Sequence, residues 1–201
     1  MVGRALAEAW EQEQHPAMST YSNKIRSISL FLLLDLLGAK NPKIPSWFKT
    51  THWAYKNMAH LETRFRTLKQ FKSSPNHGSK VRDETSMKRE PVFLTDANKK
   101  DEHFNSWAMQ DDHIPFMARG VEVLHIIPAR FPDVWHHVED DGEHLDMNTV
   151  EDWAMLVTAF AGEWMEMEGF FDTPKTAREA LSEETASDRK RRKPDNSKDE
   201  L

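Results

Sequence analysis

The feature that most limits how this chain can fold is the apolar run at residues 30–34, which is followed directly by Asp35. The run is too short for a transmembrane helix, which needs about 20 apolar residues. A signal peptide is a second interpretation, because Lys24 and Arg26 precede the run, but Asp35 and the lack of a small-residue cleavage site argue against it. We favour a strand that is buried on both faces in a largely parallel sheet.

Residues 121–127 predict a second buried-type strand, which is stopped by Pro128. We expect strands around 25–35 and 121–127 to be adjacent in one sheet, with Asp35 at the carboxyl end, where open α/β sheets form their ligand crevices. Apolar periodicity predicts helices at 2–14, 51–71 and 148–169, the last capped by Asn148 and ended by Gly169. The fold class is therefore α/β.

Two polar stretches divide the rest of the chain. Residues 72–103 carry many charges and lack clear elements, which predicts an exposed insertion. Residues 171–201 predict a disordered charged tail, which leaves 1–170 as the folded part. The last four residues read Lys-Asp-Glu-Leu, a retrieval signal that predicts the lumen of the endoplasmic reticulum. No convincing N-terminal signal accompanies it, so we expect the sequence to begin inside a longer protein.

Composition excludes several classes of function. The formal net charge of −6 gives no basic face for nucleic acid. The chain contains no cysteine, so neither a disulfide nor a thiolate metal site can form. No apolar run is long enough to predict a membrane span.

The densest polar chemistry lies between Trp107 and His136, around the second predicted strand. Carboxylates and imidazoles together suit either a zinc site or an acid–base pair. No two-ligand helical motif is present, so the spacing leaves a metal site and a satisfied polar network equally open. The candidate residues, including the acid at the end of the first strand, are Asp35, Asp111, Asp112, His113, His125, His136 and His137.

Four ungapped motifs in order resemble the glutaminyl-peptide cyclotransferase (glutaminyl cyclase) family. They are L-L-D-L-L-G-A-K-N-P at 33–42, Q-D-D-H-I-P-F at 110–116, G-V-x-V-L-H-I-I-P at 120–128 and F-P-D-V-W-H at 131–136. The resemblance extends from about residue 3 to 170. It implies the C-terminal part of a three-layer zinc-aminopeptidase-like fold, with a central mixed sheet flanked by helices.

The resemblance also implies roles for individual residues. His136 falls on the family's zinc-ligand histidine. Asp35, Asp111 and His125 fall on a buried catalytic network in which Asp35 orients the reacting amine. His137 stands beside the ligand position and is not expected to bind metal. The residues that would line the substrate pocket are Gln110, Phe131 and Trp135.

The reaction implied by the resemblance is the conversion of an N-terminal glutamine of a peptide to pyroglutamate with release of ammonia. One zinc ion would polarise the γ-carbonyl group. The family's other zinc ligands and its proton-shuttling glutamate lie upstream of the matched region, and catalytic zinc normally takes three protein ligands. We therefore expect this chain alone to bind zinc weakly and to lack cyclase activity.

Two other functions remain open from the sequence. A zinc aminopeptidase of the same fold would hydrolyse peptides. A degenerate module would bind peptide termini without catalysis. We expect one metal and cyclisation, because the sequence shows no spare set of ligands beyond His136 and Asp140.

Overall fold

The computed structural model describes residues 2–80, 84–104 and 109–170. It divides the chain into two compact units, residues 1–161 and 162–201. The first unit contains both strands and the candidate residues. Of the second, the structure describes the end of helix α4 and the short 3-10 helix η5 (Met167–Phe170). Within the described ranges, no helix combines the length and the hydropathy needed to cross a membrane.

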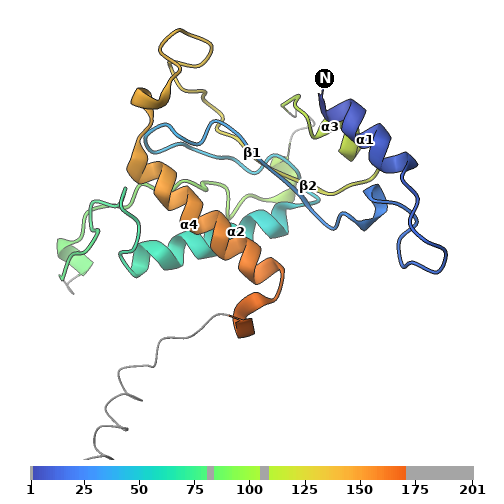
Figure 1. The fold of residues 1–201 in the computed structure, drawn as a ribbon. Coiled ribbons are helices and arrows are strands. Elements are labelled where there is room, and N and C mark those ends of the chain that lie inside the picture. Colours follow the sequence, from blue (N-terminus) through green and yellow to red (C-terminus); the bar gives the residue numbers. More distant parts are fainter. Residues whose placement is uncertain (1, 81–83, 105–108, 171–201) are drawn as a thin grey trace, which may run out of the picture. The chain divides into compact units, whose positions relative to one another are not determined.

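The two predicted strands pair in parallel, which confirms that they are neighbours (Figure 1). Strand β1 is Phe31–Leu34 and β2 is Val123–Ile126, with Phe31 opposite Val123 and Leu34 opposite Ile126. A 3-10 helix, η1 (Ile25–Ser27), occupies the start of the first predicted strand. Both strands are therefore shorter than predicted.

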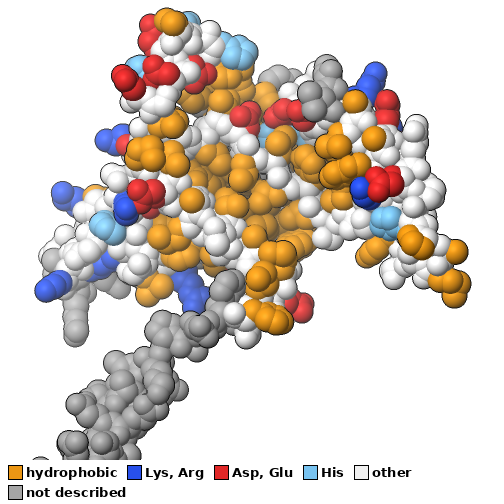
Figure 2. Space-filling view, viewed as in Figure 1, with side chains coloured by type: hydrophobic (Ala, Val, Ile, Leu, Met, Phe, Trp, Pro, Cys, Tyr) orange, Lys and Arg blue, Asp and Glu red, His pale blue; other side chains and the backbone are white. Residues whose placement is uncertain are grey.

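Burial differs between the strands. All four residues of β2 are buried, whereas Phe31, Leu32 and Leu33 of β1 are only half-buried and Leu34 is 41% exposed. The prediction of burial on both faces is therefore wrong for β1, which pairs only with β2 among the described residues. Figure 2 shows hydrophobic side chains gathered on the face in view. An apolar strand with a free edge is prone to pair with other chains.

Helices of the first unit pack on the sheet and on one another. Helix α1 (Val2–Gln12) contacts α3 (Ile114–Met117), and Figure 1 shows them side by side. Helix α2 (His52–Thr67) contacts β2, and the Thr51 hydroxyl just before it donates to the carbonyl of Val123 at 2.6 Å. The remaining 3-10 helices are η2 (Glu84–Ser86), η3 (Asp101–His103) and η4 (Gly142–His144).

Helix α4 runs from Met147 to Trp164, so both predicted caps are wrong. Asp146 caps its start, where its carboxylate accepts a hydrogen bond from the backbone N–H of Thr149 at 2.8 Å. The helix ends at Trp164, five residues before Gly169. A capping residue lies just before the first helical turn. Which acid or amide stands there depends on where the helix begins, which the sequence alone does not show.

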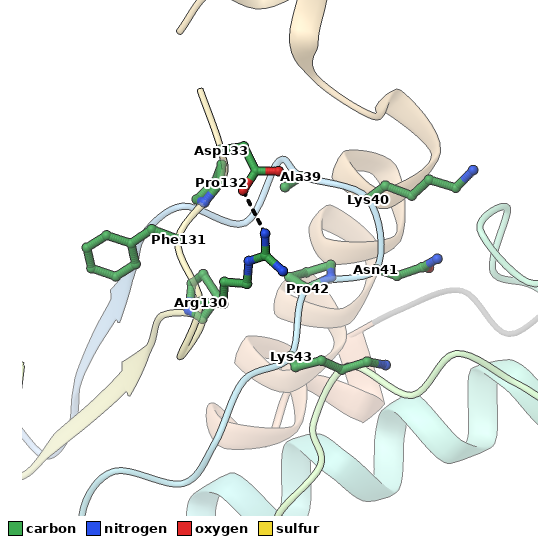
Figure 3. Close-up of a pocket in the computed structure, with 10 residues that line it drawn as sticks. Ala39, Lys40, Asn41, Pro42, Lys43, Arg130, Phe131, Pro132 and Asp133 are labelled. Carbon is green, nitrogen blue, oxygen red and sulfur yellow. Dashed lines mark hydrogen bonds and ion pairs between the residues drawn. The ribbon is translucent and has the colours of Figure 1, made fainter. Parts of the chain in front are cut away.

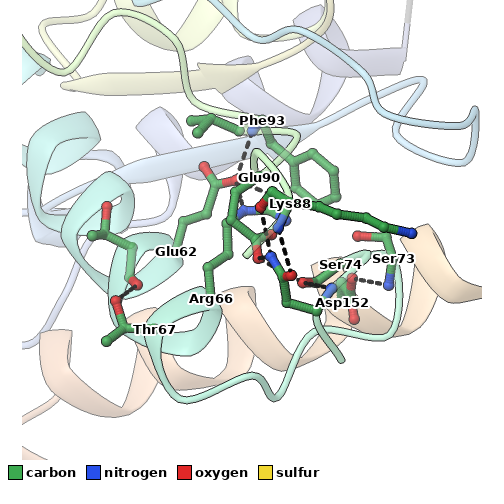
Figure 4. A network of polar contacts seen from close by, with 12 residues as sticks. Glu62, Arg66, Thr67, Ser73, Ser74, Lys88, Glu90, Phe93 and Asp152 are labelled. Carbon is green, nitrogen blue, oxygen red and sulfur yellow. Dashed lines mark hydrogen bonds and ion pairs between the residues drawn. The ribbon is translucent and has the colours of Figure 1, made fainter. Parts of the chain in front are cut away.

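Residues 72–80 and 84–94 are linked to α2 and α4 through buried polar groups (Figure 4). Glu62 of α2 accepts hydrogen bonds from the backbone N–H groups of Phe93 and Leu94 at 2.6 and 2.8 Å. Asp152 of α4 accepts those of Lys72 and Ser73 at 2.7 and 2.9 Å.

Residues 72–103 were expected to form an exposed insertion, but two apolar residues of this stretch lie in the core. Phe93 is completely buried and stacks on Trp153 of α4 at 5.3 Å between ring centroids, and Leu94 is 1% exposed. The polar stretch therefore contributes large apolar residues to the core, although its average composition hides them.

Candidate functional site

Asp35 lies where β1 ends. Its backbone N–H donates to the carbonyl of Ile126 at 3.0 Å, so the sheet holds the residue in register beside the end of β2. The next residue, Leu36, has a φ of +54°, which turns the chain sharply after the acid. Burial, followed by the negative charge of Asp111, raises the pKa of the half-buried Asp35 carboxyl.

Asp111 and His125 come together from different parts of the chain. His125 lies on β2 and is 2% exposed. Its Nε2 atom is 3.3 Å from Oδ2 of Asp111, but the contact does not have hydrogen-bond geometry, and neither ring nitrogen has a hydrogen-bond partner. Burial and the neighbouring His113 lower the pKa of His125 to about 4, against the opposing effect of Asp111. The ring is therefore neutral at neutral pH.

His113 completes this group, although the sequence assigned it no role. The residue immediately precedes α3 and is completely buried, with both ring nitrogens lacking a hydrogen-bond partner. Its ring lies 4.7 Å from that of His125 and 5.5 Å from that of Phe48, measured between centroids. Burial lowers the pKa of His113. In the sequence, the clue to its place in this group was its position two residues after Asp111.

The other predicted residues form a separate aromatic cluster. Phe131 and Trp135 meet edge to face at 4.6 Å, and the exposed His136 stacks on Trp135 at 3.7 Å. His136 has a φ of +62°, a left-handed backbone conformation that is uncommon for residues other than glycine. No hydrogen bond or ion pair of the described residues joins the cluster to Asp111 or His125. Gln110 is exposed, and Trp107 lies outside the described residues.

A pocket of about 380 Å³ lies between residues 39–43 and the segment after β2 (Figure 3). Figure 3 shows Arg130 reaching toward Asp133, with which it forms an ion pair at 3.0 Å, while the ring of Phe131 points away from residues 39–43. Phe131 is thus at the border of this pocket. Trp135 and His136 are not among its lining residues.

The described residues do not assemble a zinc site around His136. Among them, the one group of three or more acids and histidines whose donor atoms all come within 4.8 Å of one another is Asp111, His113 and His125. His136 offers a single imidazole, and a catalytic zinc site takes three protein ligands. The network residues Asp111 and His125 and the implied zinc ligand His136 therefore belong to separate groups in this structure.

Comparison with known proteins gives a consistent result. The model of peptidase family M28 matches residues 7–161. The chain is 34% identical over 166 residues to a glutaminyl-peptide cyclotransferase of Bothrops jararaca, covering 82% of this chain and 39% of the relative. It is 33% identical over 162 residues to the one of Drosophila melanogaster, covering 81% and 40%.

A solved structure shares the fold. The crystal structure of Macrostomum lignano glutaminyl cyclase superposes with a TM-score of 0.65 at 23% identity, covering 83% of this chain and 48% of that one. The chain spans about two fifths of the length of the curated relatives it matches. The resemblance found in the four motifs and the α/β fold class are confirmed.

Proposed function

This chain belongs to peptidase family M28, and we propose that it supplies the acid–histidine side of a glutaminyl-peptide cyclotransferase site. One observation carries the proposal. Asp35 follows β1, and Oδ2 of Asp111 lies 3.3 Å from Nε2 of His125 on the parallel strand β2, so the three residues gather near the carboxyl ends of the two strands. Ligand crevices of open α/β sheets lie at that edge.

The substrate would be a peptide with an N-terminal glutamine. In the reaction, its α-nitrogen bonds to the γ-carbonyl carbon, the bond from that carbon to the side-chain nitrogen breaks, and the transferred proton leaves with ammonia. Asp35 orients the neutral α-amine and, as a half-buried acid, stabilises the positive charge that the nitrogen acquires as it bonds to the γ-carbonyl carbon. Ring closure is intramolecular, so alignment supplies much of the rate.

Asp111 and His125 hold Asp35 and its surroundings in place. The aromatic cluster of Phe131 and Trp135, with Gln110, would form the wall for the glutamine side chain. A zinc ion would polarise the carbonyl in the complete site, with His136 as one ligand. The described residues do not provide the other ligands, so we propose that this chain alone turns over no substrate.

Peptide hydrolysis is the second candidate, favoured by the peptidase family to which the chain belongs. A module that binds peptide termini without catalysis is the third. We also propose a location in the lumen of the endoplasmic reticulum, supported by the motif at 198–201, which lies outside the described residues.

Mass spectrometry of a glutamine-initiated peptide separates these functions. The longest product of the gene should yield pyroglutamate and ammonia, and the 201-residue chain should yield neither. Asp35→Asn in that product should lower kcat about 100-fold or more, since the variant keeps the shape but loses the charge. Asp101→Asn, which changes an exposed acid outside the site, is the matched control and should leave kcat unchanged.

Two outcomes would contradict the proposal. Release of free glutamine in place of pyroglutamate would identify a peptidase. An unchanged kcat for Asp35→Asn would remove Asp35 from the mechanism.

A further inference from the structure

The cluster of Asp111, His113 and His125 has unused binding capacity. His113 is completely buried and His125 is 2% exposed, yet all four of their ring nitrogens lack a hydrogen-bond partner. Buried polar groups almost always have one, because burying them unpaired costs stability. Two such imidazoles in contact, at 4.7 Å between centroids, therefore point to a ligand that both would bind.

The carboxylate of Asp111 is already oriented toward these rings. Its Oδ1 atom accepts the backbone N–H of Asp112 at 2.7 Å, which leaves Oδ2 at 3.3 Å from Nε2 of His125. For metal–ligand bonds of about 2.0–2.2 Å, two ligand atoms of a tetrahedral site lie about 3.3 Å apart. The His125–Asp111 separation already has this value.

The third donor needs only a small adjustment. The ligand atoms of all three residues lie within 4.8 Å of one another, so an inward shift of up to about 1.5 Å would bring His113 to the same separation. The Asp111 side chain is 28% exposed, so solvent reaches one of the three donor residues, and a water molecule would serve as the fourth ligand. Catalytic and exchangeable zinc sites have this composition of three protein ligands and water.

We propose that Asp111, His113 and His125 bind one divalent transition-metal ion of the zinc type. Two imidazoles and one carboxylate suit zinc, cobalt, nickel or copper, whereas magnesium and calcium prefer oxygen ligands. The site does not include His136 and revises the expectation that this chain binds zinc only weakly. It goes beyond the proposed cyclase function, in which Asp111 and His125 position Asp35 and bind no metal, and metal binding by the 201-residue chain is measured separately from turnover.

Cobalt titration of the metal-free 201-residue chain tests the site. Visible absorption should show one equivalent of tetrahedral cobalt, which zinc then displaces. His113→Asn and His125→Asn should each weaken binding at least about ten-fold. His77→Asn and His137→Asn, which change exposed histidines without an assigned role, are the matched controls and should bind as the unchanged chain does.

Circular dichroism establishes that each variant is folded. Because replacing a buried histidine could unfold the chain, X-ray absorption of the zinc-loaded unchanged chain gives a second measurement. It should show two imidazole ligands. Absence of cobalt binding, fewer than two imidazoles, or binding lost in His136→Asn but kept in folded His113→Asn would overturn the proposal.

Discussion

Replacing Glu62 by glutamine tests the buried polar network that holds the backbone of Phe93 and Leu94 against α2. Glu62 is 1% exposed and accepts hydrogen bonds from Phe93, Leu94 and Nε of Arg66 at 2.6, 2.8 and 2.8 Å. Arg66 is 4% exposed, and its other acidic partner is Glu90, at 3.3 Å. The glutamine keeps the volume of the side chain but removes its charge.

The free energy of unfolding that Glu62→Gln should lose follows from the buried groups that the substitution leaves without a partner. The amide presents one oxygen and one N–H₂ donor where the carboxylate presented two acceptors, so one buried backbone N–H loses its partner. The guanidinium of Arg66 also loses its closer anion. A buried donor left unsatisfied costs about 1–3 kcal/mol, and breaking a buried ion pair costs about 3–5 kcal/mol. Since glutamine retains one acceptor, we expect Glu62→Gln to lower the free energy of unfolding by about 2–4 kcal/mol.

Urea unfolding followed by circular dichroism measures this loss. A domain typically loses about 1–3 kcal/mol of unfolding free energy per molar urea, so the midpoint should fall by about 1 M or more. Glu151→Gln is the matched control, because Glu151 also forms an ion pair but is 48% exposed. Exposed pairs contribute about 0–1 kcal/mol. Equal midpoint shifts for the two variants would refute the role assigned to the buried network.

Two further predictions concern other buried groups. The pKa of His125 is about 4 in the folded chain and near its ordinary 6.5 in the unfolded chain. As the pH falls, the unfolded chain therefore binds a proton first, and the free energy of unfolding should drop by about 3 kcal/mol between pH 6.5 and 4. Urea midpoints measured with a chelator present should show a flatter pH profile for His125→Gln, and an equally steep profile would contradict the assignment. Tyr55→Phe should cost about 1–3 kcal/mol, because the hydroxyl donates to Ile44 at 2.6 Å and accepts from Asp96 at 3.0 Å. Thermal unfolding checks this against the half-exposed Tyr21→Phe, and equal melting temperatures for both variants would show that the hydroxyl is dispensable.

Local pattern was enough to predict the two strands, their pairing and helices α1, α2 and α4. Buried-type segments around 30–34 and 121–127 predicted neighbouring parallel strands, and β1 and β2 pair in this way. The apolar repeat of α2 predicted that helix, although it ends at Thr67 and not at 71. Element boundaries depend on where backbone partners end, which periodicity alone does not reveal.

The site shows the same division. The resemblance of the motifs predicted that Asp35, Asp111 and His125 belong to one network, because residue types in order along the chain can be read from the sequence; their catalytic role stays a prediction. The contact between His113 and His125, with their unpaired nitrogens, arises only when the loop before α3 packs against β2. Likewise, Glu62 and Phe93 become buried only because α2 and the segment around Phe93, 31 residues apart in sequence, pack together. Residue types and periodicities belong to the chain itself, whereas burial and hydrogen-bond partners exist only once distant segments pack together.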